Sequence, residues 1–403
     1  MMIKVILLVI FFAVMVAVGI YSRKHAMSVD GFVLGGRSVG PWLTAFAYGT
    51  SYFSAVVFVG YAGQFGWKYG LASTWIGIGN AVIGSLMAWV VLGRRTKVMT
   101  QYLNSKTMPD FFGSRYESKP LKIAASAIVF VFLVPYTASI YNGLSRLFEM
   151  AFHIPYAWCV IGMAVFTGIY VILGGYMATA INDFIQGIIM LAGIIVVIAA
   201  VLNGQGGFLE AVGRMAEIPS DVEITLGQPG AFTSFFGPDP GNLLGVVILT
   251  SLGTWGLPQM IGKFYAIKDE KSINTGTVIS TVFAIVVSGG CYFLGGFARL
   301  FDAPAIYDEA GAVVYDSIIP HMLSALPDIL IGIVVVLVLS ASMSTLASLV
   351  LTSSSTLTLD FLKDNLLKEM SEKRQVRTMQ VLVIFFIAVS VFIALDPPTF
   401  IAQ

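Results

Sequence analysis

The stretch that decides the fold is LTSLGTWGLPQMIGKF, residues 249–264, an apolar segment interrupted by glycine and proline. Gly253, Gly256 and Pro258 fall in its middle, and proline both removes a hydrogen-bond donor and clashes with the preceding turn. A helix that breaks here leaves backbone groups unpaired, which membranes tolerate only where the break is buried in protein or lines a wet cavity. The stretch therefore predicts a broken membrane helix with a polar site at the break.

A second stretch, AFAYGTSYFSAVVFVG at 45–60, has the same character. Gly49, Thr50, Ser51 and Ser54 interrupt its apolar pattern. Interrupted segments at corresponding positions in two halves of a chain indicate the substrate and ion site of a secondary transporter with inverted repeats. The alternative interpretation is that the glycines serve tight helix packing and the proline a simple kink.

The composition around these stretches is that of a membrane protein. Of 403 residues, 57% are hydrophobic and only 11% are charged, whereas soluble domains carry about 25% charged residues. A bilayer core of about 30 Å needs about 20 apolar residues per helix. Ten segments qualify: 3–22, 41–64, 70–93, 121–148, 155–173, 180–202, 240–264, 273–298, 322–358 and 378–395. We therefore expect an all-α, polytopic chain whose two breaks lie five segments apart.

The distribution of charge predicts an orientation. If the N-terminus lies outside the cell, most of the 23 lysines and arginines fall in connections on the inner side, as the positive-inside rule requires. The formal net charge is only +1, which gives no indication of a nucleic-acid partner.

A hydroxyl-rich helix is predicted at ILIGIVVVLVLSASMSTLASLVLTSSS, residues 329–355. Residues four apart share a helix face, which places four hydroxyls in one stripe: Ser340, Ser344, Ser348 and Thr352, with Thr345 beside them. Hydroxyl and carbonyl oxygens can together hold a hard cation. Alternatively, these hydroxyls bond to carbonyls of their own helix or to a neighbouring helix.

Asp183 lies in GGYMATAINDFIQG, residues 174–187, at the expected inner end of the sixth segment. The connection that precedes it contains no lysine or arginine. An ionisable group at a membrane helix end without a local partner is a candidate for relaying or releasing a cation. The alternative is a solvated N-cap at the membrane surface.

Five motifs now carry a resemblance to a known family. They are DGFVLGGRSVGPWLTAFAYGTSYFS at 30–54, TMPDFFGSRYESK at 107–119, ILGGYMATAINDFIQG at 172–187, GLPQMIGKFYAIKDEKSI at 256–273 and ASMSTLAS at 341–348. The chain resembles the sodium/solute symporter family, and its pattern is most similar to the bacterial sodium/proline symporter branch. The motifs follow the family's order along nearly the whole chain.

The resemblance implies a leucine-transporter-like fold in a single transmembrane domain, residues 1–403. One extra N-terminal helix at 3–22 would precede inverted five-helix repeats, the first at 41–202 and an incomplete second at 240–395. Relatives continue beyond the ninth core helix, so the resemblance implies about ten helices here and a C-terminus that is truncated relative to the family.

The resemblance also implies a sodium site between the first break and the hydroxyl helix. Its ligands would be the carbonyls of Thr50, Phe53 and Ala341 and the hydroxyls of Ser344 and Thr345. A second site, or an ion release path, maps to Asp183 and Ser348. Position 347, which offers a hydroxyl in members with two ions, is Ala347 here, so one-to-one coupling is expected.

The solute site implied by the resemblance comprises Ser54, Tyr136, Trp255 and Tyr52. Tyr52 stands where the proline branch has aspartate, and Val56 and Thr250 stand where that branch has tryptophans. These departures argue against proline as the solute.

The function implied is a sodium-coupled secondary active symporter in the cell membrane, in a bacterium. It would take a small organic solute, amino acid-like, a carboxylate or a vitamin, into the cell by alternating access. Two alternatives stay open: a membrane sensor domain of the same family, or a proton-coupled transporter. An enzyme is not expected, because the three histidines accompany no nucleophile or metal cluster. The solute and the oligomeric state are left open.

Overall fold

The computed structural model describes residues 2–152, 154–367 and 369–395, and every regular element in this part of the chain is helical. Seven helical stretches are long and apolar enough to cross a membrane, and a bent pair, Pro240–Gly256 with Pro258–Ala266, makes an eighth. The expectation of an all-α, multi-pass membrane protein is confirmed.

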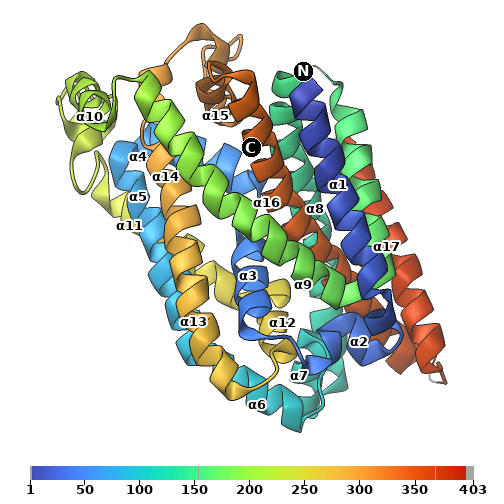
Figure 1. Ribbon diagram of the computed structural model, residues 1–403. Helices are drawn as coiled ribbons and strands as arrows, with labels where there is room; N and C mark the ends of the chain where they lie inside the picture. The colour runs from blue at the N-terminus through green and yellow to red at the C-terminus, as the bar shows by residue number, and fades with distance from the viewer. Residues whose placement is uncertain (1, 153, 368, 396–403) are drawn as a thin grey trace.

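Figure 1 shows the arrangement of the helices as a tall bundle. In chain order they are α1 (Met2–Ser22), α2 (Val29–Leu34), α3 (Pro41–Tyr52), α4 (Ala62–Tyr69), α5 (Thr74–Gly79), α6 (Arg94–Tyr102), α7 (Met108–Arg115), α8 (Lys119–Phe152), α9 (Tyr156–Gly204), α10 (Phe208–Glu217), α11 (Pro240–Gly253), α12 (Pro258–Ala266), α13 (Glu270–Ala284), α14 (Gly290–Gly295), α15 (Tyr315–Ser324), α16 (Asp328–Thr356) and α17 (Glu372–Leu395). Wide, π-type helical turns join some of them, including Val56–Tyr61, Asn80–Met87 and Leu357–Leu366.

Two long helical stretches each run across the boundary between two of the expected membrane segments. Val56–Tyr102 turns at Gly70 (φ 60°, ψ −143°), and α9 turns at Gly175 with nearly the same angles (φ 53°, ψ −143°). A Cβ at Gly175 would lie 2.8 Å from the Phe32 carbonyl oxygen, so both the positive φ and the close approach require glycine there. The expected segment at 322–358 needs a correction at its start. α16 begins only at Asp328, because Pro327 disfavours helix before it.

Both predicted breaks are present. α3 ends at Tyr52, and Phe53 adopts an extended backbone (φ −97°, ψ 105°) before the chain becomes helical again. α11 continues through one tight turn to Gly256, and Leu257 is extended (φ −75°, ψ 119°) before Pro258 opens α12. The two parts of this second broken helix meet at 51°. Glycine, hydroxyl residues and proline therefore interrupt the helices where their local chemistry predicts.

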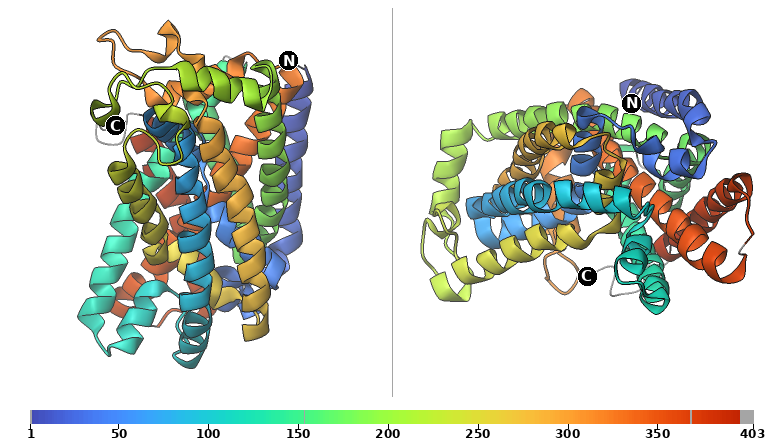
Figure 2. Two further views of the ribbon diagram at one scale, coloured as in Figure 1. Left: turned by 90° about the vertical axis from the view of Figure 1, so that its left-hand side faces the viewer. Right: turned by 90° about the horizontal axis from the view of Figure 1, so that it is seen from below.

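α16 is the helix around which the others pack. It contacts α9, α8, α1, α17 and α3, and all its residues from Leu337 to Leu351 are buried. α1 lies on the outside of the bundle against α9 and α16 (Figures 1 and 2). α2, α6 and α7 gather at the end of the bundle opposite to the N-terminus, and α10 and α15 lie at the N-terminal end. The hydroxyls of α16 consequently face protein rather than lipid.

Candidate ion and solute site

Four of the five expected sodium-ligand positions meet where α3 breaks against α16. The Ser344 hydroxyl lies 3.1 Å from the Thr50 carbonyl oxygen and 3.1 Å from that of Ala341. The Thr345 hydroxyl lies 3.3 Å from the Thr50 carbonyl and 3.1 Å from the Ala341 carbonyl. All four residues are buried. Two carbonyls and two hydroxyls from distant segments thus form one cluster of neutral oxygens.

The fifth position, Phe53, lies in the break itself. Together with Ser54 and Ala341 it lines a small buried cavity of about 10 Å³. Its extended backbone ends the helical hydrogen-bond ladder of α3, which is what makes carbonyls near the break available to other partners. Phe53 is therefore adjacent to the oxygen cluster.

The oxygen cluster has the chemistry of a site for a hard cation. Such cations hold oxygen ligands at about 2.3–2.6 Å, so neighbouring ligands lie about 3–4 Å apart, as the oxygens of the cluster do. A hydroxyl can rotate, so it can donate its hydrogen to a carbonyl oxygen or turn a lone pair toward an ion. The residues present therefore fit a sodium ion as the transported, coupling cation.

Hydroxyls elsewhere on α16 behave differently. Ser340 donates to the Val336 carbonyl (2.7 Å) and Ser342 to the Val338 carbonyl (2.8 Å), which confirms that these two are satisfied by their own helix. In the run TSSST at 352–356 this holds only in part, because Ser353 Oγ and Thr356 Oγ1 have no hydrogen-bond partner among the described residues.

Asp183 is not the solvated helix cap that one interpretation of the sequence allowed. It lies inside α9, is fully buried, and its Oδ2 is 3.5 Å from the Lys263 ammonium. Lys263 is interior as well, so the charge count was wrong to include it among the cations of the inner connections. α12 restarts at Pro258 and packs against α3 and α16, which carries Lys263 into the protein interior.

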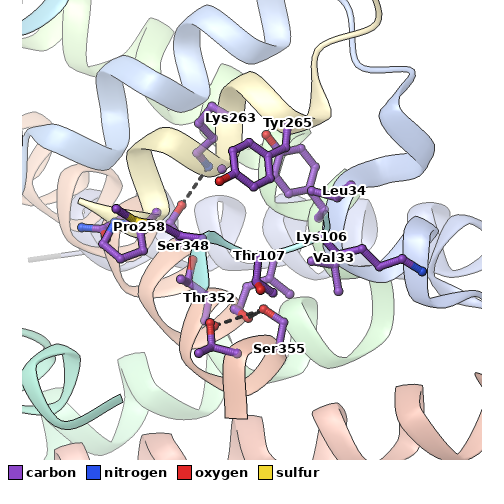
Figure 3. A pocket seen from close by; sticks show the side chains of 16 residues that line it. Val33, Leu34, Lys106, Thr107, Pro258, Lys263, Tyr265, Ser348, Thr352 and Ser355 are labelled. Carbon is purple, nitrogen blue, oxygen red and sulfur yellow. Dashed lines mark hydrogen bonds between the residues drawn. The ribbon is translucent and has the colours of Figure 1, made fainter. Parts of the chain in front are cut away.

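The Lys263 ammonium links Asp183 to the hydroxyl helix. Its Nζ donates to Ser348 Oγ at 3.0 Å, as Figure 3 shows, and lies 5.2 Å from the centre of the Tyr176 ring. Ser348 Oγ is in turn 2.9 Å from Ser51 Oγ, one residue from Thr50. The structure therefore brings Asp183 and Ser348 together, with a side-chain cation between them.

A cavity of about 40 Å³ reaches this ion pair. Its lining includes Lys263, Tyr176 and Ser348, and also Lys106 and Thr107 at the start of α7. Figure 3 shows Lys263, Ser348, Lys106 and Thr107 around it. Residues of α12 and α16 line the cavity together with the N-cap of α7, so it extends from the Lys263–Ser348 contact toward the end that holds α7.

The expected solute residues are only partly brought together. Tyr52 donates its hydroxyl to the Thr250 carbonyl (3.1 Å), which joins the two broken helices. Tyr136, on α8, is half-buried and packs against the hydrophobic core. Ser54 lines the small cavity beside Ala341. Trp255 points elsewhere, because its indole N–H donates to the Ile83 carbonyl at 2.9 Å.

Asn80 is a site residue that the sequence reasoning missed. It is buried, and its Oδ1 accepts hydrogen bonds from the Thr250 and Ser251 hydroxyls, both at 3.1 Å. Its amide nitrogen donates to Ser288 Oγ at 3.3 Å. A lone amide in the otherwise apolar segment 70–93 is the signal that would have found it.

Comparison with known proteins identifies the family. The model of the sodium:solute symporter family matches residues 32–402. The chain belongs to this family. It is 31% identical over 371 residues to a sodium/proline symporter of Staphylococcus aureus, covering 89% of this chain and 68% of the relative. It is 27% identical over 400 residues to the osmoregulated proline transporter of Bacillus subtilis, covering 98% and 78%.

Solved structures show the same fold. A Na⁺-coupled sialic acid symporter in a substrate-bound, outward-open state superposes with a TM-score of 0.79 at 14% identity, over 98% of this chain and 82% of that one. A nucleobase-cation-symport-1 family transporter in a closed conformation gives 0.50 at 14% identity, over 92% and 75%. The expected family and leucine-transporter-like fold are confirmed. Family membership assigns sodium-coupled solute symport, with sodium as the coupling ion. The boundaries of the repeats stay predictions.

Proposed function

We propose that this symporter binds one sodium ion at the carbonyls of Thr50, Phe53 and Ala341 and the hydroxyls of Ser344 and Thr345. The observation that carries the proposal is the contact of both hydroxyls with the Thr50 carbonyl. These groups come from α3 and α16, so an ion held by them ties a broken helix to the most buried helix of the bundle.

Such an ion would favour the conformation in which α3 and α16 are in contact. Each positive charge that moves inward gains about 2.3 kcal/mol per 100 mV of membrane potential. Coupling to the solute is a difference in affinity between two conformations, because a ligand shifts an equilibrium only as far as it binds one state better.

The solute would bind beside the ion, near Ser54, Tyr136 and Tyr52. Trp255, the fourth residue implied by the resemblance, would contact the solute only if its indole N–H exchanged the bond to the Ile83 carbonyl. The hydrogen bond from Tyr52 to the Thr250 carbonyl crosses this region and joins the two broken helices, so their relative movement would act on it. None of these residues carries a formal charge, which suits a small solute whose charge is met by helix ends and backbone N–H groups. An amino acid-like compound, a carboxylate or a vitamin fits this description.

Proline is one solute to test, since the names of both relatives described above give proline as the solute. Tyr52, Val56 and Thr250 replace three side chains of the proline branch and argue against it. We expect another small solute to bind more tightly than proline.

The ion would leave past Ser348 through the 40 Å³ cavity toward the end that holds α2 and α7, once the Lys263 ammonium has moved away from Ser348. With the N-terminus outside, this end faces the cytoplasm, in agreement with its lysines and arginines. Asp183 would stand beside this release path.

The decisive experiment separates the driving ions. Purified full chain is reconstituted in liposomes, and uptake of solutes first selected by sodium-dependent thermal stabilisation is measured with a sodium gradient or a proton gradient alone. We expect uptake with sodium only. Uptake driven by protons alone would instead favour a proton-coupled transporter that uses the buried Asp183–Lys263 pair. Solute binding without any uptake would favour a sensor.

A further inference from the structure

The place where a second cation would bind is defined by Asp183 and Ser348. A carboxylate and a hydroxyl are ligands that hard cations use in proteins. Lys263 lies between them, with its Nζ 3.5 Å from Asp183 Oδ2 and 3.0 Å from Ser348 Oγ. Lys263 and Asp183 are both at least 98% buried. The ammonium thus contacts the same two groups that would hold an ion.

Asp183 depends on this ammonium. Neither of its oxygens accepts a hydrogen bond from the described residues, and Lys263 is its only ion-pair partner in that part of the chain. A buried charge without a partner is strongly unfavourable, so Lys263 neutralises Asp183 in the way that a bound cation would.

We propose that the Lys263 ammonium is a built-in cation that occupies the place of a second sodium ion and limits the transporter to one sodium per cycle. This inference rests on the proposed sodium site at Thr50, Ser344 and Thr345. Ala347 supports it, because position 347 supplies no side-chain oxygen to a second ion.

Repulsion explains why lysine and a second sodium exclude each other. Two positive charges about 4 Å apart, at an effective dielectric constant of about 20, weaken binding of the second about a thousandfold. The ammonium contacts Ser348, Asp183 and Tyr176 and, among the described residues, no ligand of the first site, so repulsion on the ion there is weaker.

The test counts sodium ions bound by purified full chain, using radioactive sodium in a scintillation proximity assay. The wild type is compared with Lys263→Arg, which keeps the charge, and with Lys263→Ala combined with Ala347→Ser, which removes the charge and restores a hydroxyl. Lys263→Gln with Ala347→Ser, which keeps a donor toward Ser348, is measured in parallel in case the alanine variant does not fold. Adding Asp183→Asn to the charge-removing variant serves as the matched control.

We expect one sodium ion in the wild type and in Lys263→Arg, two in the charge-removing variants, and one again after Asp183→Asn. Two ions in the wild type would overturn the inference while leaving the first sodium site standing. One ion in a folded, monodisperse charge-removing variant would also overturn it. No sodium binding in the wild type would refute the proposed sodium site, and this inference with it.

Discussion

The hydroxyl of Ser344 lies 3.1 Å from the carbonyl oxygen of Thr50, although the two residues are 294 positions apart in the sequence. The contact joins the unwound end of α3 to the middle of α16. The contact therefore exists only while these two helices are docked. A change of conformation that separates them breaks it.

Replacing Ser344 and Thr345 together by alanine should weaken sodium binding roughly a hundredfold. Each hydroxyl removed from a buried polar cluster costs about 1–2 kcal/mol, and 1.4 kcal/mol corresponds to a factor of ten. The sodium dependence of uptake or of thermal stabilisation measures the change. Ser342→Ala is the matched control, because this buried hydroxyl of the same helix donates to its own Val338 carbonyl, and it should shift the sodium dependence less than threefold. Equal effects of the two replacements would argue against the sodium site.

Tyr52→Phe should raise the KM for the solute about fivefold and leave sodium binding nearly unchanged. It removes one hydrogen bond, to the Thr250 carbonyl, that joins the two broken helices, and such a bond contributes about 1 kcal/mol. Tyr141→Phe is the control, because the buried Tyr141 hydroxyl has no partner among the described residues. A Tyr141 variant with the larger KM would contradict the assignment of Tyr52 to the solute site.

Gly66→Ala should destabilise the protein severely. A Cβ at Gly66 would lie 1.9 Å from the Gly295 carbonyl oxygen, so α4 and α14 would have to move apart. Small residues permit such close helix contacts in membranes. The apparent Tm should fall by several degrees, or the protein should fail to accumulate. Gly245→Ala, with nothing within 4 Å of the new Cβ, should leave the Tm nearly unchanged.

Lys122→Met should also lower the apparent Tm. The Lys122 ammonium lies 2.7 Å from both Asp110 and Asp364 and 3.3 Å from Asp360, whose side chain is fully buried. Removing the cation leaves a buried carboxylate unpaired, at a cost of about 3 kcal/mol. The exposed Lys119, in the same turn of α8, provides the comparison. If Lys119→Met lowered the Tm as much, the loss would reflect surface charge in general and not this cluster.

The sequence and the structure agree where local chemistry acts. Glycine and hydroxyl residues end α3 near Phe53, and proline with two glycines interrupts the helix pair α11 and α12, as the residue types predict. The hydroxyls that bond within α16, Ser340 and Ser342, were likewise predictable, because their carbonyl partners lie four residues earlier.

The sequence by itself determined the membrane architecture, the two breaks and the hydroxyl pair at Ser344 and Thr345, because segment length and backbone chemistry are local properties. Only the tertiary structure decided that Lys263 leaves the surface to pair with Asp183, and that Asn80 faces Thr250 and Ser251. These contacts depend on how separate helices dock against one another. Which group pairs with a buried charge depends on that docking. The separation of two residues along the chain does not predict it.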